Sequence, residues 1–362
     1  MRTAERTFSR TAGASAIRID RPAISLLLGL ILILSGCRPD RAGLDGIKTD
    51  GLIPVVLQTD WFPQAEHGGF YQALVRGYYI EEGLAVEILP GGPGAMIKHK
   101  VSQGMAQFGM NRSDDIIVAV DRGLPLVMAF AVMQRDPQIL MMHPGHAAED
   151  FRDLDGRTLV ASPGLNWIAF LERRFQIRLN VQPHTYGLTH FLNDPTLIQQ
   201  GFVTNEPYYL RQHGLDPEIL MLADSGFEPY HVIFTNRVFA SEHPDTVAAF
   251  ARASIRGWRD YLEGDPTEAF AMITALNPRM TSDFLSFSRH TLIARHLVTG
   301  DSSGEDGIGR LDPARIQREI DQLRELGMVG EGLRIDSVML TTDPAGLTGS
   351  GPDLDHDLDL DR

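Results

Sequence analysis

Short apolar runs alternate with amphipathic stretches along most of the chain, and few folds can accommodate this pattern. The apolar runs are rich in aliphatic residues, as in 126–132 (LVMAFAV), which is typical of strands buried on both faces of a sheet. The intervening stretches have helical periodicity, and several begin with an N-cap residue followed by proline, as at Asp265-Pro266 and Asp312-Pro313. The pattern predicts an α/β fold with mainly parallel sheets.

A chain of 362 residues, 43% of them hydrophobic, can build two medium-sized domains with packed cores. Strands are predicted at 54–58, 85–89, 107–110, 126–132, 138–142, 158–161, 180–183, 201–204, 219–222 and 231–235. Helices are predicted at 68–76, 95–102, 113–122, 167–175, 194–199, 207–212, 244–263, 266–276, 282–294 and 313–326.

The N-terminus has the pattern of an export signal rather than of a folded domain. Five arginines precede an apolar run, 23–34, which is short for a bilayer span and suits a signal peptide. The run leads into Leu34-Ser35-Gly36-Cys37, which resembles the lipobox of bacterial lipoproteins. We therefore expect cleavage after residue 36, lipid attachment at Cys37, the only cysteine, and a flexible tether over 37–52. An uncleaved membrane anchor is the alternative, and both place the folded part outside the cytoplasm.

The charge balance excludes some classes of partner. The chain carries a net charge of −14, and removal of residues 1–36, which carry +3, would leave −17. So acidic a protein is a poor candidate for binding nucleic acid or an anionic lipid surface. Within the C-terminal segment 341–362, residues 349–362 alternate Asp with Leu and His, but the spacing lacks the glycine turn and terminal glutamate of a calcium loop. It is predicted to be an acidic disordered tail.

Polar and aromatic residues follow several predicted strands directly. Asp60 and Trp61 follow the first strand, Asn111 the third, Asn166 a later one, and Glu206 the strand at 201–204. In open α/β sheets, ligands bind beyond the carboxyl ends of the strands, where helices begin. We therefore expect these residues near a ligand.

Four stretches carry a resemblance to a known family. They are DWFP with EHGGFY at 60–71, GYYIEEGL at 77–84, GFVTNEP at 201–207 and DSGFEPY at 224–230. The chain resembles the solute-binding proteins of ABC importers, within the group that includes sulfonate, nitrate, taurine and thiamine-pyrimidine-precursor binders and the related pyrimidine synthase. The resemblance covers about residues 55–324.

The resemblance implies a two-lobed type II periplasmic-binding fold with a ligand cleft between the lobes. Lobe one would comprise 53–143 and 237–340, and lobe two 144–236. The lobes would close over the ligand by a hinge motion.

The candidate ligand-binding residues supply carboxylates, rings and amides. Asp60 and Glu206, expected from different lobes, could each accept two N–H donors from an amidine-like edge, although both could instead cap helices. The remaining candidates are Trp61, Trp167, Tyr208 and Tyr230 for stacking, and His67, Asn111 and Asn166 for hydrogen bonds. For each aromatic residue, burial in the core is an equal alternative, and His67 could serve as a helix cap.

The sequence offers few residues for a metal site or for covalent catalysis. His143 and His146 lack the spacing of a metal site, and no metal or cofactor is predicted. The related synthase needs a lysine just after the third strand and a histidine four residues on, but these positions hold Asn111 and Asp115. We therefore expect a protein that is not an enzyme.

The sequence predicts a lipid-anchored, extracytoplasmic solute-binding protein, on the periplasmic face if the source is Gram-negative. Its partners would be a small nitrogen-heterocyclic ligand, such as a thiamine pyrimidine precursor, and the permease subunits of an ABC importer, and it would be a monomer. The alternatives are a binder of sulfonate, taurine or nitrate-type anions, and a pyrimidine synthase-like enzyme.

Overall fold

The computed structural model describes residues 51–300 and 307–341, and within them two five-stranded sheets form the framework. The predicted signal peptide, the lipid-attachment site Cys37, almost all of the tether and the acidic tail lie outside the described residues. The α/β class predicted from the alternation of apolar runs is confirmed.

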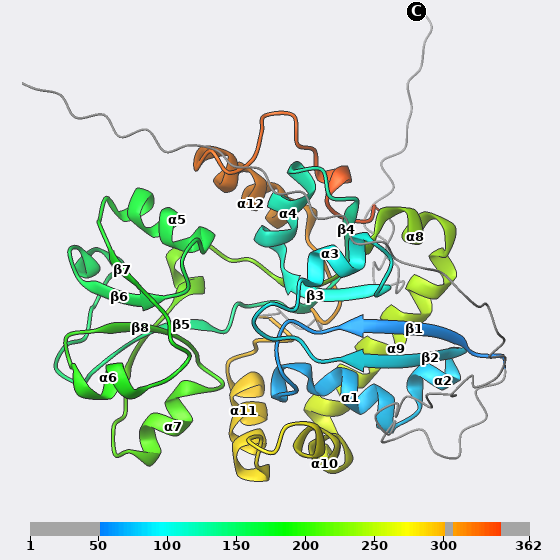
Figure 1. Cartoon of the computed structure of the whole chain (residues 1–362), viewed down its shortest axis with the longest axis horizontal. Coiled ribbons are helices and arrows are strands. Elements are labelled where there is room, and N and C mark those ends of the chain that lie inside the picture. Colours follow the sequence, from blue (N-terminus) through cyan, green and yellow to red (C-terminus); the bar gives the residue numbers. More distant parts are fainter. Residues whose placement is uncertain (1–50, 301–306, 342–362) are drawn as a thin grey trace, which may run out of the picture. The chain divides into compact units, whose positions relative to one another are not determined.

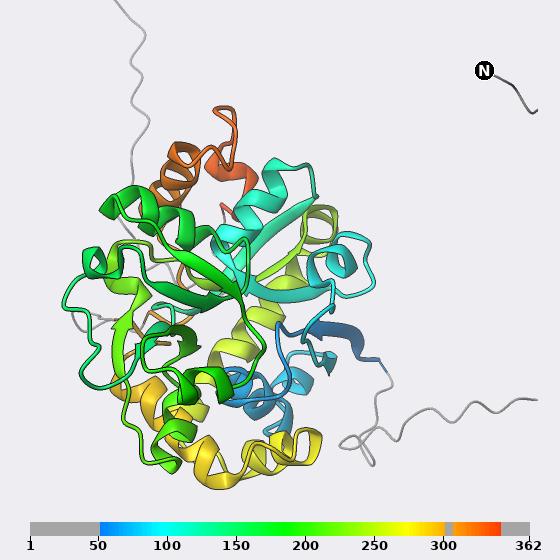
Figure 2. The ribbon, with the colours of Figure 1, turned by 60° about the vertical axis from the view of Figure 1, so that its left-hand side comes forward.

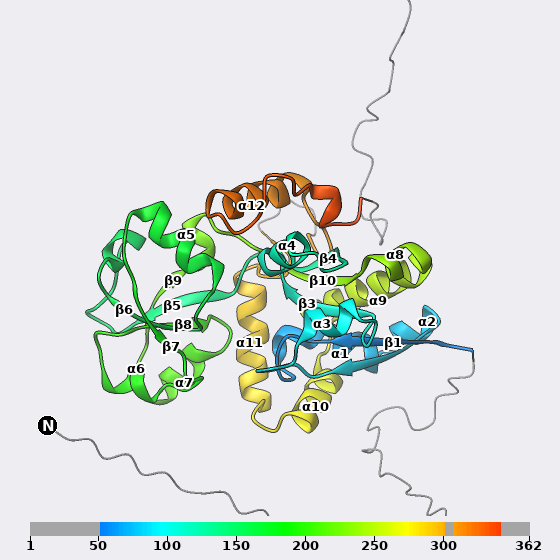
Figure 3. The ribbon, with the colours of Figure 1, turned by 45° about the horizontal axis from the view of Figure 1, so that its top comes forward.

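The first sheet, which defines lobe one, has the strand order β2-β1-β3-β10-β4 (Figures 1 and 3). Its members are β1 (Ile53–Gln58), β2 (Leu84–Leu89), β3 (Phe108–Arg112), β4 (Leu126–Met133) and β10 (His231–Asn236). Strand β1 pairs in parallel with β2 and β3, whereas β10 is antiparallel to both of its neighbours. The edge strand β4 is buried along its whole length, and bridges from Met128 to Met339 and from Ala131 to Gly309 cover its outer side.

The second sheet, which defines lobe two, has the order β7-β6-β8-β5-β9 and faces the viewer in Figure 2. Its members are β5 (Gln138–Met142), β6 (Thr158–Ala161), β7 (Asn180–Pro183), β8 (Ile198–Phe202) and β9 (Glu218–Met221). Strands β6, β7 and β8 run parallel, and β5 is antiparallel to β8 and β9.

Helices flank both sheets. Around the first sheet lie α1 (Gly68–Val75), α2 (Tyr78–Glu81), α3 (Ile97–Ser102), α4 (Ser113–Asp121), α8 (Arg237–Glu242), α9 (Pro244–Glu263), α10 (Thr267–Leu276), α11 (Ser282–Ala294) and α12 (Pro313–Glu325). Around the second lie α5 (Asn166–Phe175), α6 (Thr189–Asn193) and α7 (Glu206–Gln212). Helices α4 and α12 lie on one side of the first sheet, and α1 and α9 on the other (Figures 1 and 3).

Helices α1 and α9 pack unusually closely because small residues face each other. A Cβ atom at Gly69 would lie 2.2 Å from the ring of Trp258, and one at Gly68 would lie 2.1 Å from the ring of Tyr261. A Cβ atom at Gly257 would in turn meet the carbonyl oxygen of Gly69 at 2.3 Å. The two glycines after His67 therefore serve helix packing.

The chain crosses between the sheets twice, and each crossing lies one strand earlier than the sequence suggested. Strand β5 belongs to the second sheet, so the first crossing is at 134–137 rather than near 143. Strand β10 belongs to the first sheet, so the chain returns at 222–230 rather than near 236. Both misplaced strands are short apolar runs, and such runs carry no mark of the sheet that they join.

Most predicted elements agree with the structure to within two residues, but one region differs. The helix predicted at 194–199 is wrong, because β8 begins at Ile198 and the preceding helix, α6, ends at Asn193. The strand predicted at 201–204 accordingly starts earlier. Gln199 and Gln200 are buried within β8, and buried glutamines are a poor strand signal in a single sequence.

Candidate binding site between the two lobes

Asp60 lies just beyond the end of β1 and is held by a buried histidine. The Nε2 atom of His67 is 2.8 Å from Oδ1 of Asp60, and the histidine side chain is 0% exposed against 28% for the aspartate. Burial would raise the pKa of Asp60, but the hydrogen bond and charge of His67, with the charge of His231, lower it overall. Asp60 is therefore ionised and oriented. His67 is buried, so it holds Asp60 through their hydrogen bond and is not itself exposed.

Trp61 is half-buried and contacts an aromatic residue of the other lobe. Its ring lies 5.6 Å from the ring of Phe62, edge to face, and 5.4 Å from the ring of Tyr186. Trp61 thus keeps the position expected of a stacking residue. Sequence reasoning missed Tyr186, although it lies shortly after the strand at 180–183, where the strand-end pattern could have marked it.

Two glutamates from opposite lobes lie in the same region. Glu66, in the short 3-10 helix η1 (Ala65–His67), accepts a hydrogen bond from the Thr204 hydroxyl across the lobes. Glu206, at the start of α7, accepts one from the backbone N–H of Phe202 at 2.6 Å. Burial raises the pKa of Glu66, and burial with repulsion by Glu66 raises the pKa of Glu206 to about 7. Among the described residues, no basic side chain pairs with either glutamate.

Arg112 is buried at the end of β3 and is neutralised by aspartates. Its Nε and Nη2 atoms donate to the two carboxylate oxygens of Asp114 at 3.0 and 2.7 Å, and Asp136 lies 3.8 Å away. Burial would lower the pKa of Arg112, but the nearby carboxylates raise it, so the guanidinium stays charged. Asn166 of lobe two donates to Asp114 at 2.9 Å, which adds another hydrogen bond between the lobes.

Asn111 is half-buried beside Arg112, and its side-chain oxygen accepts from the Arg112 backbone N–H at 2.8 Å. Its amide nitrogen is therefore the group that could serve a ligand. Asn166, by contrast, uses its amide nitrogen for the contact with Asp114.

Three other predicted stacking residues pack against protein side chains. Trp167 is 1% exposed within the apolar core under α5, and Tyr230 is 2% exposed with the guanidinium of Arg315 3.7 Å above its ring. Tyr208 packs on Phe284 and Phe287 of α11 at ring distances of 4.9 and 5.3 Å. The rings of Trp167 and Tyr230 are covered by protein, so we do not retain these two as stacking residues. Tyr208 is half-buried, and its contact with a ligand stays a prediction.

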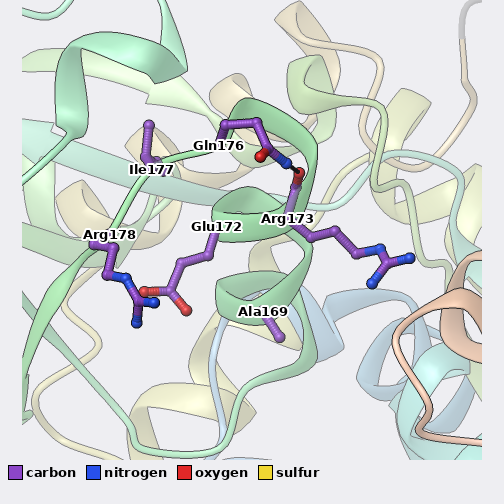
Figure 4. Close-up of a pocket in the computed structure, with 6 residues that line it drawn as sticks. All are labelled: Ala169, Glu172, Arg173, Gln176, Ile177 and Arg178. Atoms are coloured by element: carbon purple, nitrogen blue, oxygen red, sulfur yellow. Dashed lines mark hydrogen bonds between the residues drawn. The ribbon is translucent and has the colours of Figure 1, made fainter.

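The described parts of the chain, 51–300 and 307–341, hold a further pocket but no cluster of metal ligands. They contain no group of three or more His, Cys, Asp or Glu residues that could hold a metal ion. They also contain no helix with the length and apolar character needed to span a membrane. A pocket of about 390 Å³ lies around the end of α5 (Figure 4), lined by Ala169, Glu172, Arg173, Gln176, Ile177 and Arg178. It shares no residue with the inter-lobe region, so we do not assign it to the same site.

Comparison with known proteins identifies the family. Residues 64–269, more than half of the chain, match the model of the NMT1/THI5-like family. The chain belongs to this family. The match includes Glu66, His67, Asn111 and Glu206, and it ends within α10.

Two relatives of this NMT1/THI5-like protein are binding proteins by name. The formylaminopyrimidine-binding protein of Halalkalibacterium halodurans is 27% identical over 265 residues, 69% of this chain and 77% of that protein. The riboflavin-binding protein RibY of Chloroflexus aurantiacus is 25% identical over 288 residues, 76% of this chain and 81% of that protein. A third relative is an enzyme by name, the 4-amino-5-hydroxymethyl-2-methylpyrimidine phosphate synthase THI12 of Saccharomyces cerevisiae, 22% identical over 65% of this chain and 74% of that protein.

Solved structures confirm the fold of the NMT1/THI5-like chain. The aliphatic sulphonate-binding protein SsuA of Escherichia coli superposes with a TM-score of 0.58 at 14% identity, covering 83% of this chain and 95% of that one. The nitrate-binding protein NrtA of Synechocystis PCC 6803 gives 0.55 at 11% identity, covering 80% and 86%. The two-lobed periplasmic-binding fold expected from the sequence is thereby confirmed.

Proposed function

We propose that this protein is the extracytoplasmic solute-binding component of an ABC importer and that its ligand is a small nitrogen heterocycle. Membership of the NMT1/THI5-like family and the two-lobed fold support the general role. Two relatives are named for binding a pyrimidine and a flavin, both of them nitrogen heterocycles. A thiamine pyrimidine precursor is the ligand that we favour.

The observation that carries the choice of ligand is a set of three carboxyl groups, two of which form no ion pair among the described residues. Glu206 of lobe two and Glu66 of lobe one have no ion pair among the described residues, and Asp60 is held in the ionised form by His67. Carboxylates in such surroundings favour a ligand that presents N–H donors, as the amino and protonated ring nitrogens of an aminopyrimidine do. A hydrogen bond to a charged group contributes about 1.5–3 kcal/mol.

The charges of the same region argue against sulfonate, taurine or nitrate. Arg112 is paired with Asp114, Arg135 with Asp224, and His231 lies 3.6 Å from Asp136. These cations are therefore already balanced by aspartates. An incoming anion would instead meet the ionised carboxylate of Asp60, and like charges at close range are unfavourable.

The synthase alternative is disfavoured by the residue at one position. The related synthase needs a lysine at this point of the chain for the aldimine that its chemistry requires, and the position holds Asn111, the next-to-last residue of β3. An amide nitrogen cannot form that aldimine. We therefore propose binding without turnover.

The proposed function includes a lipid anchor on the protein and an ABC permease as its partner. Cys37 would carry the lipid, the permease would receive the ligand from the closed lobes, and the protein would act as a monomer. A Cys37→Ala substitution is expected to release the protein from the membrane fraction, and its retention there would contradict lipid attachment.

Isothermal titration with formylaminopyrimidine, riboflavin and an alkanesulfonate tests the choice of ligand. We expect one of the two ring compounds to bind with micromolar or tighter affinity, which corresponds to about −8 kcal/mol or below. Glu206→Gln should weaken that binding about 10-fold or more, whereas Glu242→Gln, a change at an exposed glutamate on α8, should not. Tight binding of the alkanesulfonate, with none of either ring compound, would refute the proposal.

A further inference from the structure

Tyr186 is an exposed aromatic residue in a strained backbone conformation. It lies between β7 and α6 in lobe two, and its side chain is 60% exposed. Its φ angle of 58° is in the left-handed region, which bulky residues rarely adopt. Such strain persists only where the surroundings hold it, and it is concentrated at ligand clamps and switch regions.

The surroundings of Tyr186 hold its backbone in this conformation. The Tyr186 N–H donates to Nδ1 of His184 at 2.6 Å, and the two rings lie 5.2 Å apart. Nε2 of Gln199, which is buried in β8, donates to the carbonyl oxygen of Gly187 at 3.2 Å. The His184 N–H donates to the carbonyl oxygen of Ala161 in β6 at 3.1 Å, so the turn is tied to the sheet on both sides of Tyr186, whose side chain is exposed.

The Tyr186 ring meets Trp61 of the other lobe. The two ring centroids are 5.4 Å apart at an interplanar angle of 41°. Trp61 is supported on its own lobe by Phe62, and the Phe62 ring lies over Gly92, where a Cβ atom would be 3.0 Å from it. Trp61 therefore has an aromatic neighbour on its own lobe, and Tyr186 meets it from the other lobe.

We propose that Trp61 and Tyr186 form an aromatic clamp between the lobes that selects planar ligands. This inference rests on the proposed function and adds Tyr186 as the residue that recognises the face of the ring, while the carboxylates recognise its edge. Stacked atoms lie about 3.5–4 Å apart, so a ring between the two would need a centroid separation of about 7–8 Å. The contact observed here would open by about 2 Å, which a hinge motion or a small shift of the turn provides.

The test uses Tyr186→Ala and Tyr186→Phe. The control is Leu276→Ala, which removes another exposed apolar side chain, 52% exposed at the end of α10. Titration with formylaminopyrimidine and riboflavin should show binding about 2- to 10-fold weaker in Tyr186→Ala, as for loss of one aromatic pair. Tyr186→Phe and Leu276→Ala should bind like the wild type.

A second measurement needs no ligand. Trp167 and Trp258 are buried at 1% and 0% exposure, so acrylamide quenching of tryptophan fluorescence reports mainly on Trp61, and Trp61→Phe should remove the quenchable emission. Tyr186→Ala should make this emission more accessible to acrylamide, and unchanged quenching would overturn the contact.

The outcomes separate the two proposals. Unaltered ring binding in Tyr186→Ala, together with loss of binding in Glu206→Gln, would overturn the clamp and leave the proposed function standing. Failure of the wild type to bind either ring compound would overturn both.

Discussion

Replacing Glu206 by glutamine is expected to stabilise the protein at alkaline pH. Burial, together with repulsion by Glu66, raises the pKa of Glu206 from the ordinary value of 4.5 to about 7. A carboxyl group whose pKa is raised by folding favours the folded state at low pH, and this contribution is lost as the pH rises through the pKa of the folded state. Above pH 7 the folded protein must therefore hold an unfavourable charge that glutamine does not carry.

The expected gain in the free energy of unfolding follows from the shift in the pKa of Glu206. A rise from 4.5 to about 7 corresponds to about 3.4 kcal/mol at full effect. Glu206 is only half-buried, so solvent screening reduces the figure, and we expect about 1–3 kcal/mol at pH 8. Below pH 4.5 both states are protonated and the difference should vanish. The side-chain oxygen of glutamine can still accept the hydrogen bond from the Phe202 N–H, so little else changes.

Urea denaturation of the wild type and Glu206→Gln at pH 4, 6 and 8 measures the effect as a difference in the free energy of unfolding. The variant should gain stability progressively between pH 4.5 and 8, while Glu242→Gln should follow the wild type at every pH. A variant that is equally stable at pH 8, or less stable there than the wild type, would refute the reasoning. If the gain is observed and ligand binding falls, this carboxylate is retained for function at a cost in stability.

Two further substitutions test the supports of the site. Gly69→Ala should destabilise the protein by about 1–3 kcal/mol, because the added methyl would lie 2.2 Å from the Trp258 ring. The control Gly332→Ala places its methyl in open space and should leave the stability unchanged. Equal unfolding midpoints for Gly69→Ala and the wild type would contradict the close helix packing. His67→Gln should raise the pKa of Asp60, because it removes the hydrogen bond and charge that lower it. NMR titration of the aspartate carboxyl signals measures this pKa. An unchanged pKa of Asp60 in the variant would show that His67 does not hold the carboxylate.

Much of the fold could be predicted because its local signals are strong. The strand at 138–142 and the helix at 244–263 were predicted with the bounds that the structure shows. The apolar run of the strand and the proline that begins the helix act within a few residues of sequence. The helix predicted at 194–199 failed where glutamines occupy a buried strand.

The positions of some candidate site residues could be predicted for the same reason. Asp60 and Trp61 follow β1, and Glu206 begins α7, so their place at strand ends could be read along the chain. Their contacts could not: Asp60 meets His67 seven residues on, and Trp61 meets Tyr186 in the other lobe.

Periodicity along the chain specified the elements, their order and the ends at which polar residues gather, because each of these depends on near neighbours in sequence. Only the tertiary structure decided which side chains lie in the core and which face the other lobe. Trp167 and Tyr230 carry the same local signals as an exposed ring, yet other elements cover them, whereas the strained turn at Tyr186 brings a ring to Trp61. Burial depends on what packs against a face, and that partner is distant in sequence.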